Sequence, residues 1–272
     1  MARKYFQSRV VESRNLCSNV KHIVFEPQQD EPFEYIPGQF VMIHFPNEAG
    51  LELNRSYSIS SIPGECKGYA LCVKRVDFGK GSTLLHSLEV GQEIKTSGPF
   101  GRFTLREEQP KDIILAATGT GIAPFRSMLD QLKAAMDQTT RVHVLMGVRH
   151  TNELLYHDEL TQLAADNPNF TYRPCVSRPA PEDNWEGRVG YVGSFLDDLE
   201  AEGSLVPGDT VAYLCGVPPM IDGMRNSFKE RGFDRRAIRT EKFASPPDPV
   251  PKSATPKAAP AFKPKFLKKA KK

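Results

Sequence analysis

The sequence has no long apolar run. None of its stretches approaches the roughly 20 consecutive apolar residues that a helix needs to span a bilayer, so we expect no transmembrane segment. The first ten residues, MARKYFQSRV, carry charges with no apolar stretch behind them. A secretory signal is therefore not expected, and the sequence favours a cytoplasmic protein.

Cysteine is scarce and scattered. The chain contains five, and neither a C-x-x-C pair nor a C-x4-C-x2-C group occurs among Cys17, Cys66, Cys72, Cys175 and Cys215. Their spacing excludes a zinc ribbon and a plant-type iron–sulfur cluster held by this chain, so we expect free thiols and no metal site. Helix-turn-helix and RNA-binding signatures are missing too, and no specific nucleic acid partner is expected.

The net charge of +3 conceals an uneven distribution. Residues 244–272 hold eight lysines, seven prolines and one aspartate, a local charge of +7, which leaves −4 for the rest of the chain. Such a segment cannot bury enough apolar area to fold. We therefore predict that 244–272 is a disordered basic tail, able to contact an anionic partner or to remain solvated without one.

The chain up to about Arg106 is typical of an antiparallel β-barrel. Turn signals such as Pro37-Gly38 and Pro63-Gly64 separate short strand-like segments, and one helical segment at 82–88 is placed to cap a barrel end. The predicted strands are 20–25, 40–45, 55–60, 69–76, 93–96 and 102–105. We assign residues 1–108 to this barrel domain.

The pattern changes from Asp112 onward. Apolar strand-like runs alternate with helical ones, which predicts a doubly wound α/β domain with a parallel sheet over 109–243. Ligands of such sheets bind outside the carboxyl ends of the strands. The predicted strands are 112–118, 141–148, 170–176, 210–215 and 237–243, and the predicted helices are 122–137, 152–165, 194–201 and 218–231.

One candidate binding segment is Asn54-Arg55-Ser56-Tyr57-Ser58-Ile59-Ser60. If it is a strand, Arg55 and Tyr57 share one face while Ser56 and Ser58 share the other. The planar guanidinium of arginine suits phosphate. A plain strand with an exposed arginine explains the same pattern.

Two further candidates follow predicted strands. Gly119-Thr120-Gly121 opens a helix, where glycines let backbone approach a pyrophosphate and the helix N-terminus offers N–H groups. It is not a G-x-G-x-x-G fingerprint, and any strand-to-helix turn can use glycine. The second, Cys215-Gly216-Val217-Pro218, places a cysteine at the ligand edge of the sheet, although proline at a helix start is also a structural device.

Five motifs in this order resemble the ferredoxin–NADP reductase family over residues 5–243. They are Arg55–Ser58, Cys72–Arg75, Gly81–Thr83, Gly119–Ser127 and Cys215–Met220. The fourth, Gly119-Thr120-Gly121-Ile122-Ala123-Pro124-Phe125-Arg126-Ser127, looks especially similar to plant-type members. The resemblance implies a flavin-binding barrel followed by a nicotinamide-nucleotide domain.

The resemblance also implies roles for matching residues. Arg55 would hold the flavin pyrophosphate, Tyr57 would pack on the isoalloxazine ring, and Ser58 would reach its N5 edge. Phe243 would cover the opposite ring face with Glu241 near Ser58, which makes Ser58, Cys215, Glu241 and Phe243 the expected catalytic residues. The remaining flavin contacts would come from Ser56, Cys72, Val73, Lys74, Gly81, Ser82 and Thr83, and the dinucleotide contacts from Thr120, Gly121, Cys215 and Gly216.

The cofactors are expected to be FAD and NADP(H). FAD is favoured over FMN. The loop after Arg75 is too short to assure an aromatic that stacks on adenine, although Phe78 could serve. Ser177, Arg178 and Arg188 look like the 2′-phosphate grip of NADP(H) enzymes, although the arginines could equally be solvated loop charges. Gly190 occupies about the place of an adenine-stacking tyrosine, for which Tyr191 could substitute. The chain continues past Phe243, where plant-type members end.

The leading hypothesis is a reductase that passes electrons between NADP(H) and an acidic ferredoxin or flavodoxin. One alternative is an NADH-linked reductase component for an oxygenase or for free flavin. Another is an electron-transfer subunit of a larger complex. The sequence does not distinguish among these acceptors.

Overall fold

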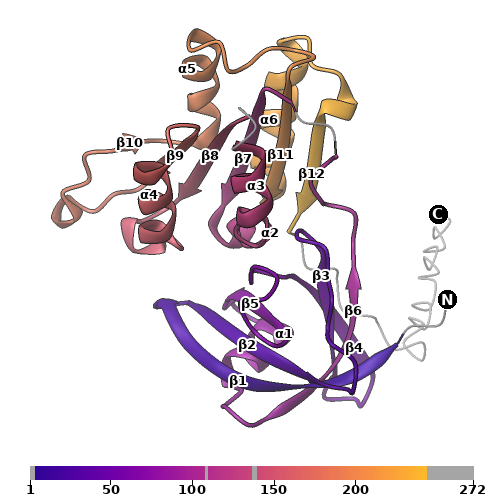
Figure 1. The fold of residues 1–272 in the computed structure, drawn as a ribbon. Coiled ribbons are helices and arrows are strands. Elements are labelled where there is room, and N and C mark those ends of the chain that lie inside the picture. The colour runs from indigo at the N-terminus through magenta and orange to yellow at the C-terminus, as the bar shows by residue number, and fades with distance from the viewer. Residues whose placement is uncertain (1–3, 108–109, 137–139, 244–272) are drawn as a thin grey trace, which may run out of the picture.

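The computed structural model describes residues 4–107, 110–136 and 140–243. It contains two sheets, one from the earlier and one from the later part of the chain, which Figure 1 shows one above the other. We call residues 4–107 the first half and the later described residues the second half. The predicted tail at 244–272 lies outside the described residues.

The first half is a six-stranded antiparallel sheet curled into a barrel-like shape, as the sequence predicts. Its strand order is β4-β3-β6-β1-β2-β5. Helix α1 (Lys80–Ser87) follows β5, close to the expected position. The strands are β1 (Tyr5–Cys17), β2 (Val20–Gln28), β3 (Phe40–Pro46), β4 (Glu52–Ser58), β5 (Tyr69–Lys74) and β6 (Glu93–Phe100).

In the first half, one strand is missing from the prediction and one predicted strand is wrong. The missing strand is β1. Buried and exposed residues alternate only at its start, where Phe6, Ser8 and Val10 are buried, and most of the remainder is polar. Residues 102–105 form no strand. That segment leads out of the barrel, and its buried Phe103 packs on Phe125 and Tyr213 of the second half.

The second half is a parallel sheet in the order β10-β9-β8-β7-β11-β12, with helices on both faces. Each central strand is buried on both sides, which is why it reads as a continuous apolar run. The strands are β7 (Asp112–Thr118), β8 (Arg141–Val148), β9 (Phe170–Val176), β10 (Arg188–Val189), β11 (Thr210–Gly216) and β12 (Ile238–Lys242).

Three predicted helices are shorter or interrupted in the structure. The one expected at 122–137 divides into α2 (Ala123–Ser127) and α3 (Leu129–Met136) after a 3-10 turn at Gly119–Ile122. The Ser127 hydroxyl donates to the Pro124 carbonyl at 2.8 Å and accepts the Gly38 N–H of the first half at 3.0 Å, which favours a bend here.

The helix expected at 152–165 begins later, as α4 (His157–Asp166), because Tyr156 has a left-handed backbone with φ of 54°. Helix α5 (Leu196–Ala201) follows a 3-10 turn over the first residues of its predicted range, and α6 (Pro218–Glu230) agrees closely. Among the described residues, no helix is both long and apolar enough to cross a membrane.

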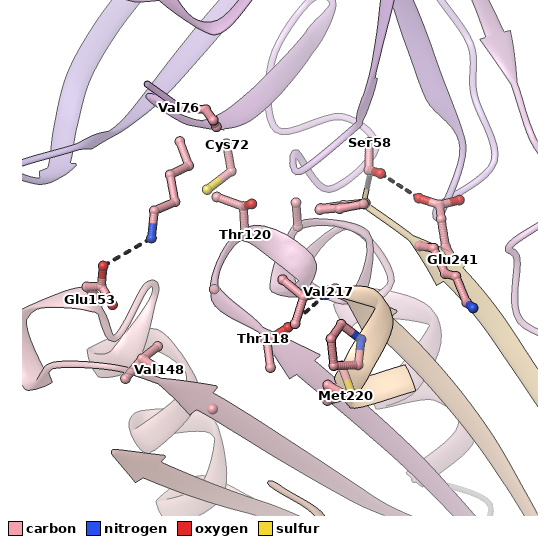
Figure 2. Close-up of a pocket in the computed structure, with 18 of the residues that line it drawn as sticks. Ser58, Cys72, Val76, Thr118, Thr120, Val148, Glu153, Val217, Met220 and Glu241 are labelled. Atoms are coloured by element: carbon pink, nitrogen blue, oxygen red, sulfur yellow. Dashed lines mark hydrogen bonds and ion pairs between the residues drawn. The ribbon is translucent and has the colours of Figure 1, made fainter. Parts of the chain in front are cut away.

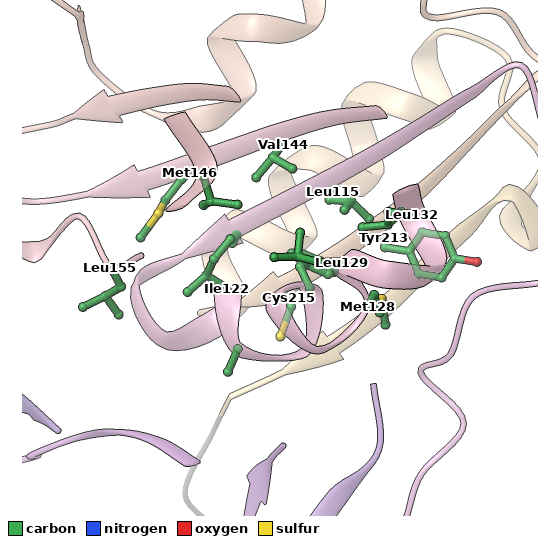
Figure 3. Close-up of a cluster of buried hydrophobic side chains, with 14 of the residues drawn as sticks. Leu115, Ile122, Met128, Leu129, Leu132, Val144, Met146, Leu155, Tyr213 and Cys215 are labelled. Atoms are coloured by element: carbon green, nitrogen blue, oxygen red, sulfur yellow. The ribbon is translucent and has the colours of Figure 1, made fainter. Parts of the chain in front are cut away.

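Alternate residues of the parallel strands supply two different cores. One face of the sheet packs Leu115, Val144 and Met146 against α2 and α3 (Figure 3). The same cluster takes in Val20 and Cys72 from the barrel, so apolar packing continues from one half into the other. The opposite face packs against α5 and α6.

A buried ionic group anchors the edge of the sheet where β7, β8 and β9 begin. The Asp112 carboxylate is 1% exposed and lies 2.9 Å from His143 Nε2 and 2.8 Å from Arg141 Nη2. His143 Nδ1 lies 2.8 Å from the Thr171 hydroxyl. Burial lowers the pKa of His143, so a neutral ring joined to both neighbours is favoured.

Removing Asp112 should therefore destabilise the second half. We expect Asp112→Ala to lower the free energy of unfolding by about 3 kcal/mol, because His143 and Arg141 would each lose their hydrogen-bond partner in or beside the core. The exposed ion pair between Lys111 and Asp209 provides the control, and Lys111→Met should cost about 1 kcal/mol or less. Urea unfolding measures both, and equal losses would contradict this account.

Candidate active site

A large cleft lies between the two halves, at the carboxyl ends of β7, β8, β9 and β11 (Figure 2). Its volume is about 1110 Å³. Sites for a single small ligand are usually roughly 300–1,000 Å³, so this cleft can hold two ligands at once. The barrel contributes one wall, and the strand-to-helix loops of the parallel sheet contribute the other.

Strand β4 carries the first predicted motif. Arg55, Ser56, Tyr57 and Ser58 all line the cleft, although alternate strand residues point to opposite faces. Both faces can reach the cleft because β4 is the outer strand of its sheet. Burial raises the pKa of the Tyr57 phenol to about 12, so the ring is neutral and apolar in character.

The N-terminus of α1 approaches this strand closely. A Cβ on Gly81 would lie 2.9 Å from Arg55 Cγ and 3.0 Å from the Tyr57 hydroxyl, so glycine is needed for the approach. The first turn of a helix has N–H groups without intrahelical acceptors. Together with the Arg55 guanidinium, these groups fit a pyrophosphate, and the residues present are therefore suited to a flavin dinucleotide.

The other predicted flavin contacts divide into two groups. Cys72, Lys74 and Ser82 line the cleft. Val73 and Thr83 are not among the lining residues: Val73 is 1% exposed in the barrel core, and Thr83 faces solvent. Val73 lies between the lining residues Cys72 and Lys74, and Thr83 follows the lining residue Ser82. Adjacent residues of a strand or helix point in different directions, so these two side chains point away from the cleft.

The nucleotide loop is built by a close backbone approach between β7 and β11. A Cβ on Gly121 would lie 2.2 Å from the Cys215 carbonyl oxygen, and Gly216 has φ of 143°. The Thr118 hydroxyl accepts the Val217 N–H at 3.1 Å. Thr118, Thr120 and Gly216 consequently line the cleft, while Gly121 is buried beneath them.

Cys215 differs from the expectation. Its side chain is fully buried in the core of the second half rather than in the cleft wall (Figure 3). Burial raises the pKa of its thiol well above the usual range, with a further contribution from the nearby Glu241 carboxyl. The carboxyl end of a strand thus brings its backbone to the ligand edge without exposing every side chain there.

Strand β12 closes the cleft on the side of β4. The Ser58 hydroxyl donates to a Glu241 oxygen at 2.7 Å, as Figure 2 shows. The Phe243 N–H donates to the Gly216 carbonyl at 2.8 Å, and Phe243 lines the cleft beside them. Burial raises the pKa of the Glu241 carboxyl above its ordinary value, although the hydrogen bond from Ser58 opposes this shift.

The predicted phosphate grip is only partly assembled. Ser177 lines the cleft, but Arg178 and Arg188 are not among the lining residues. Arg178 is exposed, whereas Arg188 is held by Asp198 at 2.6 Å and by the Ser194 carbonyl at 2.6 Å. The charge of Arg188 is therefore already partly used within the protein.

Besides Lys242 of β12, which is paired with Asp222, sequence reasoning missed two charged residues after β8 that line the cleft. Arg149 follows β8, and its carbonyl accepts the Arg178 N–H at 2.8 Å. Glu153 accepts from Lys74 of the first half at 3.0 Å. The available signal was their place directly after a predicted parallel strand, where ligands bind.

Comparisons with known proteins agree with this geometry. Residues 7–105 match the oxidoreductase FAD-binding domain family, and residues 115–226 match the oxidoreductase NAD-binding domain family. The site therefore belongs to a flavoprotein oxidoreductase that takes FAD and a pyridine nucleotide.

Ferredoxin–NADP reductase B of Sorangium cellulosum is 34% identical over 243 residues, which cover 88% of this chain and 97% of that protein. The phenol hydroxylase P5 protein of Acinetobacter pittii is 33% identical, covering 89% of this chain and 67% of its own. The fold also matches the Neisseria gonorrhoeae ferredoxin–NADP⁺ reductase, solved with FAD and NADP, at a TM-score of 0.74 and 22% identity over 88% of this chain and 98% of that one. The chain belongs to the ferredoxin–NADP reductase family.

The partly buried Glu241 carboxyl predicts a pH-dependent stability. Because its pKa is raised, the folded protein keeps this proton to a higher pH than the unfolded chain does, and stability declines as pH rises from about 4.3 through the folded pKa. Glutamine cannot ionise and still offers Ser58 an acceptor. As pH rises across that interval, the free energy of unfolding of Glu241→Gln, measured with urea, should increase relative to that of the parent. A difference that does not change with pH would contradict the raised pKa of Glu241.

Proposed function

We propose that this protein passes electrons between NADP(H) and a ferredoxin or flavodoxin through bound FAD. The observation that carries the proposal is that one cleft is bordered by the Arg55–Ser58 segment of the barrel and the Thr118–Thr120 loop of the parallel sheet. The hydrogen bond between Ser58 and Glu241 joins the two walls. Neither half contains the whole site.

Each wall has a separate task in this proposal. Arg55 and the start of α1 hold the flavin pyrophosphate, and Tyr57 and Phe243 present apolar rings that exclude water. When bound, the flavin accepts a hydride and releases electrons singly. The Ser58 hydroxyl donates a hydrogen bond to Glu241, and burial raises the pKa of that carboxyl. Phe243 acts as a cover that moves aside when the nicotinamide binds.

The absorption spectrum of purified protein, followed by dye reduction with each nucleotide, tests the proposal. A simple flavin spectrum with no iron, and faster reduction by NADPH than by NADH, is the expected result. A colourless protein that FAD does not reconstitute would exclude it. We favour FAD over FMN because Phe78 is fully exposed with φ of 59°, in the loop that precedes α1, where its ring can stack on adenine.

The arginines that follow β8 and β9 are the basis for the proposed preference for NADP(H). Arg149 and Arg178 are neighbours through their backbones, and Ser177 lies in the same part of the cleft. Two guanidinium groups suit the 2′-phosphate, a dianion, better than a ribose diol. Arg188 can add less to this grip, because it is already paired with Asp198.

Arg178→Ala should therefore weaken NADPH binding far more than NADH binding. Loss of a charge-assisted hydrogen bond to phosphate costs about 1.5–3 kcal/mol, roughly ten- to a hundredfold in Kd. Arg173→Ala in β9, the strand that precedes Arg178, is the control, because Arg173 is paired with Glu202. Nucleotide titration followed by flavin absorbance measures both, and equal losses for the two nucleotides would refute a role in selectivity.

A cationic surface beside β12 supports an acidic protein partner. Segments 102–107 and 234–239 hold five arginines and two acids, and they lie side by side (Figure 1). Arg239 donates to the Arg102 carbonyl at 3.1 Å, and Arg106 donates to the Arg236 carbonyl. Within the described part of the chain, none of the five forms an ion pair with a carboxylate. This strand leads directly to Glu241 and Phe243 at the cleft.

Charge reversal of this surface should slow electron transfer to a protein acceptor and spare a small one. We expect the double variant Arg235→Glu and Arg236→Glu to lower the rate with an acidic ferredoxin about tenfold or more at low salt, because steering depends on opposite charge. The control, Lys67→Glu with Lys133→Glu, changes the net charge equally at exposed sites elsewhere. Loss of ferricyanide reduction, or an equal effect of the control, would contradict the docking role.

A second candidate is an NADH-linked reductase component for an oxygenase. Relatives include the phenol hydroxylase P5 protein and the toluate 1,2-dioxygenase electron transfer component of Pseudomonas putida, which is 30% identical over 88% of this chain. Faster reduction by NADH than by NADPH would favour this candidate.

A further inference from the structure

A buried arginine outside the proposed chemistry connects the two halves. Arg126 lies in α2, seven residues after Gly119 of the nucleotide loop, and its side chain is 7% exposed. Its guanidinium donates four hydrogen bonds to protein acceptors and lies 4.8 Å from the centre of the Tyr156 ring. A planar, rigid set of donors is needed to satisfy these partners together.

Three of the four bonds reach the first half. Nη2 and Nη1 of Arg126 donate to the two oxygens of Glu65 at 2.7 and 2.9 Å. Nη1 also donates to the Ser60 carbonyl at 2.9 Å. Ser60 is two residues beyond Ser58, the end of the strand that lines the flavin side of the cleft. The arginine therefore joins the end of that strand to the helix that follows the nucleotide loop.

The fourth bond stays within the second half. Arg126 Nε donates to Glu159 of α4 at 2.8 Å. The two carboxylates are similarly exposed, 37% for Glu65 and 36% for Glu159. They thus contact one guanidinium from opposite sides of the boundary. Glu65 does so through two oxygens, one of which also accepts the Ile62 N–H at 2.9 Å, and Glu159 does so through one oxygen.

Neighbouring contacts cross the boundary at the same place. Tyr156 Oη lies 3.0 Å from His22 Nδ1 of the barrel, and Ser127 accepts from Gly38. These are single bonds, whereas Glu65 forms a two-oxygen pair with Arg126. The Arg126–Glu65 pair is consequently the most directional of these contacts.

We propose that Arg126 is a positioning residue that sets the distance between the flavin and nucleotide walls of the cleft, an inference that rests on the proposed function. It contacts neither ligand site, since it is not among the residues that line the cleft. Hydride transfer requires the two reacting rings in close and ordered contact, and a displacement of about 1 Å can cost roughly a hundredfold in rate. Binding of each ligand depends mainly on one wall and should be much less affected.

The matched pair Glu65→Gln and Glu159→Gln tests this. Both remove one carboxylate charge from the same guanidinium, but only the first weakens the link between the halves. For the holoprotein mixed anaerobically with NADPH, Glu65→Gln should lower the limiting rate of flavin reduction about tenfold or more, with the nucleotide Kd within about twofold. Glu159→Gln should change neither by more than about twofold.

Melting temperature and flavin content control for general destabilisation. Similar losses of melting temperature in the two variants, with a loss of rate only in Glu65→Gln, support positioning. Equal rates in the two variants overturn it, as does a rate loss in Glu65→Gln that Kd explains entirely. Arg126→Lys provides a second variant that keeps the charge but not the fork, and it should resemble Glu65→Gln.

Hydrogen exchange separates this inference from the proposed function. Amides of residues 59–66 should exchange faster in Glu65→Gln than in Glu159→Gln or the parent, whatever the nucleotide or acceptor is. If neither nucleotide reduces the flavin of the parent protein, the proposed function fails. The exchange rates still show in that case whether the Arg126–Glu65 pair holds the two halves together. Unchanged exchange in Glu65→Gln overturns the inference even in an active reductase.

Discussion

Ser58 and Glu241 lie 183 residues apart in the chain, and the 2.7 Å hydrogen bond between them joins the end of β4 to the last strand of the other sheet. Neither wall of the cleft is a site alone: the barrel offers an arginine and a helix N-terminus, and the parallel sheet offers a glycine-rich turn. Everything proposed for this protein depends on the two walls being held in one orientation. The boundary is therefore built from buried polar pairs as well as apolar packing, because directional bonds specify a geometry that apolar contacts leave looser.

Two glycines allow close approaches that shape the cleft. Gly121 lies against the Cys215 carbonyl, so a side chain there would separate the loop from its strand. Gly81 lies against the side chains of Arg55 and Tyr57, so a side chain there would displace them. Both positions shape the cleft from below its surface. The shape of the ligand site therefore depends on residues such as these glycines as well as on the residues that would contact a ligand.

Much of this fold could be predicted from sequence because buried parallel strands are long apolar runs with little ambiguity. The bounds of β7, β8 and β9 follow directly from that pattern. Strand β1 could not be found the same way, since much of it is polar and is held in place by pairing with β2 and β6. The bend at Met128 was equally hidden, because it involves a hydrogen bond from Gly38, which lies 89 residues earlier. For the site, motif order located the cleft walls, but side-chain direction required the structure: the Cys215 thiol points into the core, and Arg188 is already paired with Asp198.

The two specificities of such a protein are located in different places. Nucleotide choice is proposed for the loops after β8 and β9, inside the cleft, whereas the cationic segments that would receive an acceptor lie outside it along β12. The chemistry between them uses residues from neither region. Substitutions at one surface can therefore change the acceptor without altering the nucleotide, and the reverse is equally true. This separation gives a physical reason why relatives of similar identity carry names as different as ferredoxin–NADP reductase and phenol hydroxylase component. Overall identity averages over the whole chain, while each specificity depends on a few charged side chains, so the acceptor has to be inferred from those side chains and their unpaired charge.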